Sequence, residues 1–289
     1  MRLSGELYSL KSSLHVYAVV IVLISSNPVA IANNSHFTLD LPSGNSGFLT
    51  GSEILSDLSS KPHTETEQFI RDEILKGNIP DWLRELIPVT VSNTNHEITF
   101  FVTADYLSVG DDSDYFTAPM TPILAQQIAD SADAILPTRK MADLIWHAAP
   151  LKLTPFPLSP SEKMTTLSGF AEHNKLIQSK RNAFLEKHPL GTLTAGSKKD
   201  IIISDRYYNY QTPRVIIYGW HKQNGSPIQP VSGIHDIQYV DYSHGVRLIS
   251  RFAILDGKKV RIDDILTDAK YAPLISDEGR MEHLRYPVK

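Results

Sequence analysis

The residues best suited to chemistry are gathered between residues 214 and 249, which hold three histidines and two aspartates. In chain order they are His221, His235, Asp236, Asp241 and His244. Imidazole and carboxylate groups can exchange protons with a substrate, and both can bind a divalent metal. No other stretch is so dense in titratable groups, so we expect the functional site here.

Spacing decides which of these groups can act together. In one straight strand, His235 and Asp241 would lie about 20 Å apart, because each residue advances the chain by about 3.3 Å. Asp241 and His244 would converge if the chain bends at residues 242 and 243, and the following Gly245 favours a bend or bulge. A constellation of Asp241, His244 and His221 is therefore predicted, with His221 brought across from a neighbouring strand end.

Three interpretations of this constellation stay open. His221, Asp241 and His244 could hold a divalent metal such as zinc and an activated water, although no HExxH or HxH motif accompanies them. Without a metal, His244 would be a general base oriented by Asp241, with Arg247 stabilising an oxyanion. In the third interpretation, these residues are structural and hydrogen-bonded at the end of a sheet.

Aromatic side chains accompany the titratable groups. Together with His235, they are candidate substrate-binding residues, namely Tyr218, Trp220, Tyr239 and Tyr242. Aromatic faces can form a stacking platform for sugar rings. They favour, as the alternative to an enzyme, a non-catalytic protein that binds a glycan or the cell envelope.

Strands of a second, largely antiparallel sheet must position these residues. Their β-branched and aromatic content predicts strands at residues 201–203, 215–218 and 237–242. Alternation along the middle strand would put His221 on one face and Tyr218 and Trp220 on the other. Residues 222–227 have turn composition, which Pro230 and Gly233 extend.

Helices and a hairpin are predicted before this sheet. Helices are expected at residues 52–58, 64–76, 121–132, 138–148 and 168–188, and a hairpin from strands at 89–91 and 98–103. The caps are Thr64 with Glu67 in a capping box, Thr121 and Thr138. Arg139 and Lys140 fall in a first helical turn, where the helix dipole disfavours cations. A solvated pair is the commoner explanation, and an acidic partner or an anionic ligand is the alternative.

The overall pattern predicts an α+β fold, with a helical N-terminal part packed on a largely antiparallel sheet. Residues 33–289 are expected to form a single domain. The proline-rich segment 151–160 is an extended connection and the one internal seam that composition indicates. Near the C-terminus we expect a strand, turn and strand around Asp256 and Gly257, a short helix at 262–266, and ten loosely held final residues.

Residues 1–32 have the pattern of an export signal. Arg2 and Lys11 precede a nine-residue apolar run from Val16 to Ile24, and residues 30–32 form an A-x-A cleavage site. The alternative is an uncleaved anchor, but a spanning helix needs about 20 apolar residues. We therefore expect a periplasmic or secreted protein with no stable membrane span after cleavage.

Composition excludes several classes of protein and of function. The 289-residue chain has 42% hydrophobic and 21% charged residues, which is ordinary for a globular protein. Its formal net charge of -4 carries no electrostatic footprint of nucleic-acid binding. It has no cysteine, so a disulfide or a thiol nucleophile is excluded.

Two resemblances accompany this pattern. The segment SHGVR, residues 243–247, resembles the SHGCxR signature of L,D-transpeptidases, which cross-link peptidoglycan through a cysteine thiolate. Here the cysteine position is missing, so that mechanism cannot operate. The segments LPTRKM (136–141), IYGWH (217–221) and DYSHGVRL (241–248) resemble a group of exported bacterial proteins of similar length, and this resemblance implies a bacterial exported setting without implying an activity.

These observations together favour an exported hydrolase. Its expected substrate is a cell-envelope or extracellular polymer, either peptidoglycan or polysaccharide, and its His/Asp site is metal-dependent or metal-free. The alternative is the non-catalytic glycan- or envelope-binding protein.

Overall fold

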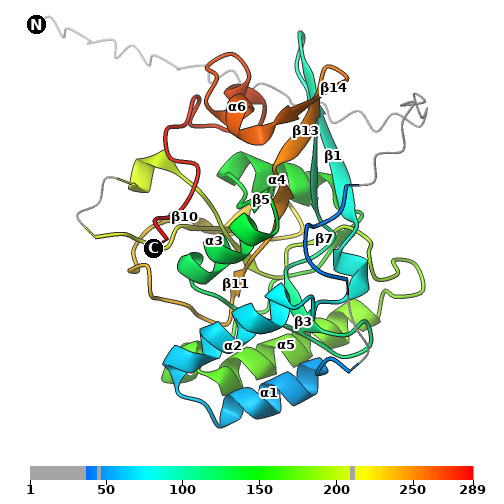
Figure 1. Ribbon diagram of the computed structural model, residues 1–289, viewed down its shortest axis with the longest axis vertical. Coiled ribbons are helices and arrows are strands. Elements are labelled where there is room, and N and C mark those ends of the chain that lie inside the picture. Colours follow the sequence, from blue (N-terminus) through cyan, green and yellow to red (C-terminus); the bar gives the residue numbers. More distant parts are fainter. Residues whose placement is uncertain (1–36, 44–46, 209–211, 289) are drawn as a thin grey trace, which may run out of the picture.

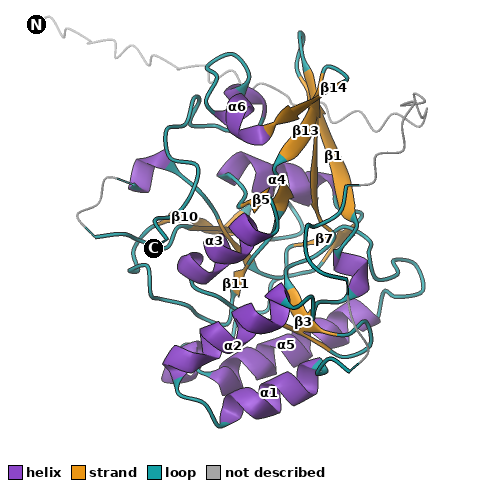
Figure 2. Ribbon diagram, viewed as in Figure 1, coloured by secondary structure: helices purple, strands orange, loops and turns teal. Residues whose placement is uncertain are grey.

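The computed structural model describes residues 37–43, 47–208 and 212–288, and it shows a mixed α+β fold (Figures 1 and 2). The predicted signal segment 1–32 lies outside the described residues. Within the described residues, no helix combines the length and apolar character that crossing a bilayer requires.

The larger sheet has six strands in the order β14-β13-β2-β12-β5, with β1 also paired to β2. All of its pairs are antiparallel. Its strands are β1 (Leu86–Ser92), β2 (Glu97–Thr103), β5 (Ala134–Ile135), β12 (Ile249–Ser250), β13 (Phe252–Leu255) and β14 (Lys258–Arg261). The β1-β2 and β13-β14 hairpins confirm the two hairpins predicted from sequence.

The smaller sheet carries the residues of the predicted site. Its order is β10-β9-β8-β11, where β8 and β11 are parallel and the other neighbours antiparallel. The strands are β8 (Lys199–Ile201), β9 (Ile217–His221), β10 (Pro227–Ser232) and β11 (His244–Gly245). Two short pairs complete the strands, β3 (Ser108–Gly110) with β4 (Tyr115–Thr117) and β6 (Leu151–Lys152) with β7 (Thr194–Ala195).

Six α-helices lie in the described residues. They are α1 (Gly51–Ser59), α2 (His63–Leu75), α3 (Pro122–Ser131), α4 (Arg139–Ala148), α5 (Leu167–Asn182) and α6 (Ile262–Leu266). Helices α1, α2 and α5 gather at one end of the molecule, and α6 lies at the opposite end beside β13 and β14 (Figure 1). The predicted caps at Thr121 and Thr138 are confirmed, since their side chains accept from the amides of Leu124 and Met141.

Three local predictions are wrong. Helix α2 begins at His63 after an N-cap at Pro62, so Thr64 is not its N-cap, and Glu67 accepts hydrogen bonds from Thr121. The predicted strand at 237–242 is a turn, and the strand that pairs with β9 is β10, inside the predicted turn region. Strand β10 lies at the sheet edge, where the missing N–H group of Pro230 breaks no internal ladder.

The final residues pack against the rest of the fold, although we expected them to be loosely held. Met281 and Tyr286 are buried. The hydroxyl of Tyr286 donates to the carbonyl of Ile202 at 2.6 Å and accepts from the amide of Ile216 at 3.0 Å. One continuous hydrophobic core joins Leu39 to Tyr286, so residues on both sides of segment 151–160 share it.

Candidate functional site

A tight turn brings Asp241 and His244 together, as the spacing predicted. The amide of His244 donates to the carbonyl of Asp241 at 3.1 Å, and His244 then enters β11. A Cβ on Gly245 would lie 2.4 Å from the Tyr106 ring and 2.7 Å from Cβ of Lys198. Gly245 is therefore required for close packing of β11, which fixes where the His244 ring lies.

The imidazole of His244 is fully buried, and neither ring nitrogen has a hydrogen-bond partner among the described residues. Burial lowers the pKa of His244 to about 4, against the opposing charge of Asp241. The ring is therefore neutral at neutral pH and has a lone pair available. An unpaired buried imidazole is costly, because buried polar groups are nearly always hydrogen-bonded.

The carboxylate of Asp241 is held in place beside that ring. Its Oδ1 accepts from the amide of Ser243 at 2.7 Å and from the Ser243 hydroxyl. Its Oδ2 lies 3.7 Å from Nζ of Lys199. Burial opposes ionisation, but His244, Lys199 and the Ser243 hydrogen bonds outweigh it and lower the pKa of Asp241. The site therefore pairs a neutral imidazole with an ionised carboxylate.

A stacked pair of rings marks the outer side of this site. His235 is exposed and stacks on half-buried Tyr239 with centroids 3.8 Å apart. The Tyr239 ring in turn lies edge-on to His244 at 5.8 Å. His235 and Tyr239, both predicted substrate-binding residues, thus lie between the buried imidazole and the surface.

His221 belongs to a different group, so the predicted three-residue constellation does not assemble. Its Nε2 lies 2.9 Å from Oδ1 of Asp143 on α4, and the Tyr218 hydroxyl donates to the same oxygen at 2.6 Å. The predicted alternation is therefore wrong. Positive φ values at Gly219 (102°) and Trp220 (55°) break the strand's alternation and put Tyr218 and His221 on the same side.

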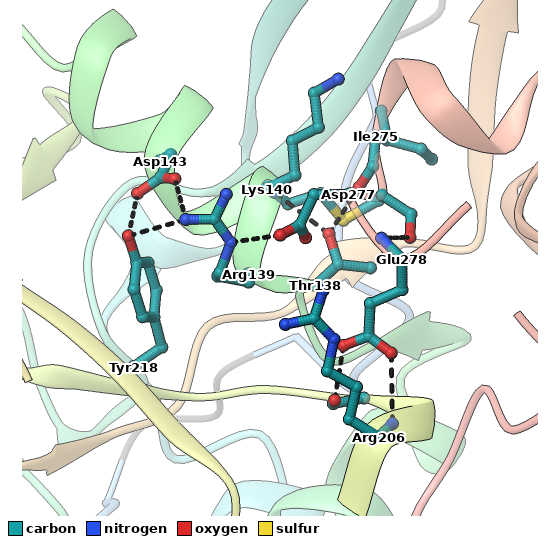
Figure 3. A network of polar contacts seen from close by, with 12 residues as sticks. Thr138, Arg139, Lys140, Asp143, Arg206, Tyr218, Ile275, Asp277 and Glu278 are labelled. Carbon is teal, nitrogen blue, oxygen red and sulfur yellow. Dashed lines mark hydrogen bonds and ion pairs between the residues drawn. The ribbon is translucent and has the colours of Figure 1, made fainter. Parts of the chain in front are cut away.

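Arg139 completes this second group, as Figure 3 shows. It lies 3.1 Å from Oδ2 of Asp143 and 2.5 Å from Oδ2 of Asp277. Arg139 therefore has acidic partners, which was the alternative to the solvated pair. Burial opposes ionisation of Asp143, but the hydrogen bonds from His221 and Tyr218 and the charge of Arg139 lower its pKa. These hydrogen bonds and ion pairs hold α4 against β9.

Arg247 is an internal residue and cannot stabilise an oxyanion at His244. Its side chain is 1% exposed and donates to the carbonyls of Thr103 and Thr194. Its Nε lies 3.5 Å from Oδ1 of Asp200, and its guanidinium stacks over the Tyr106 ring at 4.1 Å. The guanidinium is therefore bound inside the protein by carbonyl, carboxylate and aromatic groups.

The predicted stacking platform is largely buried. Tyr218, Trp220 and Tyr242 are 3%, 4% and 2% exposed, so they offer no face to a sugar. Trp220 donates from Nε1 to the carbonyl of Ser197. The hydroxyl of Tyr242 accepts from the amide of Leu158 at 2.8 Å.

The metal interpretation does not fit the side chains. Across residues 37–43, 47–208 and 212–288, no three His, Cys, Asp or Glu side chains form a group that could hold an ion. His221 faces Asp143, while one oxygen of Asp241 is occupied by Ser243. His221, Asp241 and His244 therefore cannot converge on one cation as predicted.

Sequence reasoning missed four residues of the polar interior, namely Asp143, His173, Lys198 and Lys199. His173 and Lys198 are fully buried, and both contact Tyr242. The Tyr242 ring centre lies 4.6 Å from that of His173, and its carbonyl accepts from Lys198 at 2.6 Å. Burial lowers the pKa of Lys198 to about 7. Two adjacent lysines, separated from an apolar run by Asp200 alone, were the available signal for this region.

Comparison of the chain with protein families, with curated proteins and with solved structures found no match.

Proposed function

We propose that this protein is an exported hydrolase that cleaves a cell-envelope or extracellular polymer, with His244 as its general base. The supporting observation is the buried His244 ring beside the ionised carboxylate of Asp241, because neither ring nitrogen has a hydrogen-bond partner in the described part of the chain. Such a group does not stabilise the fold. General-base catalysis, however, needs a neutral imidazole next to a carboxylate.

The chemistry that suits these groups is general-base hydrolysis of an acyl bond. His244 takes a proton from water, and the oxygen of that water attacks the acyl carbon. Asp241 stabilises the imidazolium, and the Lys199 ammonium, 3.7 Å from Asp241, is the nearest cation for the developing oxyanion. The imidazolium then returns its proton to the leaving group as the acyl bond breaks.

The test is release of soluble fragments from dye-labelled peptidoglycan and release of the free carboxylic acid from an O-acylated polysaccharide. A general base contributes about 10²- to 10⁴-fold to a rate, so His244→Gln should lower release at least a hundredfold. His147→Gln is the matched control, because His147 is exposed at the end of α4. A His244→Gln protein that folds and keeps its rate would exclude His244 as the base.

The second candidate is a non-catalytic glycan-binding protein, and the exposed His235 stacked on Tyr239 favours it. Two ring faces at the surface suit stacking against a sugar. In that case the wild type would bind either polymer without releasing fragments. Tyr239→Ala would weaken binding, and His244→Gln would leave it unchanged.

A further inference from the structure

A groove separate from the His244 site lies between segment 150–156 and the C-terminal part of α5. Its volume is about 550 Å³. Its side chains include Leu151, Lys152, Phe156, Lys180, Phe184 and His188. Gln223, just after β9, closes one end and donates to the carbonyl of Lys152 at 2.8 Å.

The groove is cationic. Lys152 and Lys180 line it, and no aspartate or glutamate is among its lining residues. Glu186 lies on the same turn as His188 but does not line the groove. This contrasts with the chain as a whole, whose formal net charge is -4. An anionic ligand should therefore bind at this groove in preference to the rest of the surface.

Aromatic faces accompany the cations. Phe184 is 43% exposed on the turn after α5, and Phe156 is half-buried. The Lys180 ammonium lies 5.1 Å from the centre of the Phe156 ring. Flat apolar faces alternating with positive charges match a chain of sugar rings that carry carboxylates.

The backbone of the groove disfavours an added peptide strand. Strand β6 has two residues and already pairs with β7. Pro150, Pro155 and Pro157 have no N–H group, so this wall lacks the row of donors that strand addition uses. Recognition must therefore come from side chains, which suits a polysaccharide better than an extended acidic peptide.

We infer that this groove binds an acidic polysaccharide. Lys180 pairs with its carboxylates, and Phe184 stacks against a sugar ring. Lys152, whose ammonium donates to the carbonyls of His147 and Ala149, adds positive charge to the wall of the groove. This inference does not depend on hydrolysis at His244. It would hold for the hydrolase and for the binding protein alike.

The experiment measures binding of polygalacturonate to the purified protein by calorimetry at low and at high salt. Neutral dextran and polyglutamate serve as comparison ligands. Lys180→Glu and Phe184→Ala should each weaken polygalacturonate binding at least tenfold, and added salt should weaken it further. Lys175→Glu is the matched control, because Lys175 is exposed on the same helix but does not line the groove.

Each outcome decides the matter. Loss of binding in Lys180→Glu and Phe184→Ala with retention in Lys175→Glu supports the inference, provided the variants melt at the wild-type temperature. Equal loss in Lys175→Glu would show diffuse attraction to surface charge and overturn it. No binding to polygalacturonate, or equally tight and equally variant-sensitive binding of polyglutamate, would also overturn it.

Discussion

Nε2 of His221 lies 2.9 Å from Oδ1 of Asp143, although the two residues are 78 positions apart in the chain. This contact joins the end of β9 to the middle of α4. The hydroxyl of Tyr218 donates to the same carboxylate oxygen at 2.6 Å. One carboxylate therefore serves two largely buried side chains and fixes the helix against the sheet.

Removing that carboxylate should destabilise the fold. In Asp143→Ala, the Tyr218 hydroxyl and the His221 imidazole lose their shared acceptor while remaining buried, which costs about 1–3 kcal/mol of unfolding free energy. Urea denaturation measures the difference. Asp264→Ala, at an exposed position on α6, should change stability by less than about 0.5 kcal/mol. Equal effects in the two variants would contradict a structural role for Asp143.

The partner of His221 illustrates what the sequence could not predict. Local signals located most elements, because a cap such as Thr138 acts on an amide three residues away. Two residues with positive φ determine which side chains of β9 share a face. One of them is Trp220, and a tryptophan seldom adopts a positive φ. Which helix covers the strand is a long-range packing outcome. The Asp241 to His244 turn was predictable because it is local, and the His221 contact was not.

Arg247 should be essential for stability. Its buried guanidinium faces Asp200 and binds the carbonyls of Thr103 and Thr194. Arg247→Met would leave the Asp200 carboxyl buried without its cation, a type of change that costs about 3–5 kcal/mol. Burial already raises the pKa of Asp200 to about 6 with the arginine present. Equilibrium unfolding in urea measures the loss.

A double-mutant cycle tests the cause. If the cost of Arg247→Met comes from the stranded Asp200 carboxyl, adding Asp200→Asn should recover part of it, so that the double variant is more stable than the sum of the single effects. Strict additivity would mean that Arg247 acts through its carbonyl contacts and its packing on Tyr106 alone.

Tyr286 should anchor the C-terminal segment. Its hydroxyl bridges the carbonyl of Ile202 and the amide of Ile216, so Tyr286→Phe should cost about 1–3 kcal/mol by leaving both groups unpaired. Tyr208→Phe is the control, since Tyr208 is 45% exposed. Proteolysis near residue 280 should accelerate only in Tyr286→Phe. This anchor could not be predicted from the sequence, because a lone aromatic near a chain end also occurs in frayed termini.

Acid should destabilise the protein partly through His244. Its pKa is about 4 in the fold, whereas an unperturbed histidine has a pKa of about 6.5. The unfolded chain therefore binds this proton more readily, so the stabilising contribution is complete above about pH 6.5 and is lost as the pH falls toward 4. The slope reaches about 1.4 kcal/mol per pH unit within that window.

Comparison with His244→Gln isolates this contribution. Asp200 takes up a proton in the folded state over part of the same range, because its pKa is raised to about 6, and this opposes the loss of stability. His173, whose pKa burial lowers to about 2, adds a loss of the same sign in both proteins. The informative quantity is therefore the difference in unfolding free energy between wild type and variant, measured in urea at several pH values. Between pH 6.5 and pH 4.5, the wild type should lose more unfolding free energy than His244→Gln. A difference that does not change with pH would mean that the His244 ring has the same pKa in the folded and unfolded states.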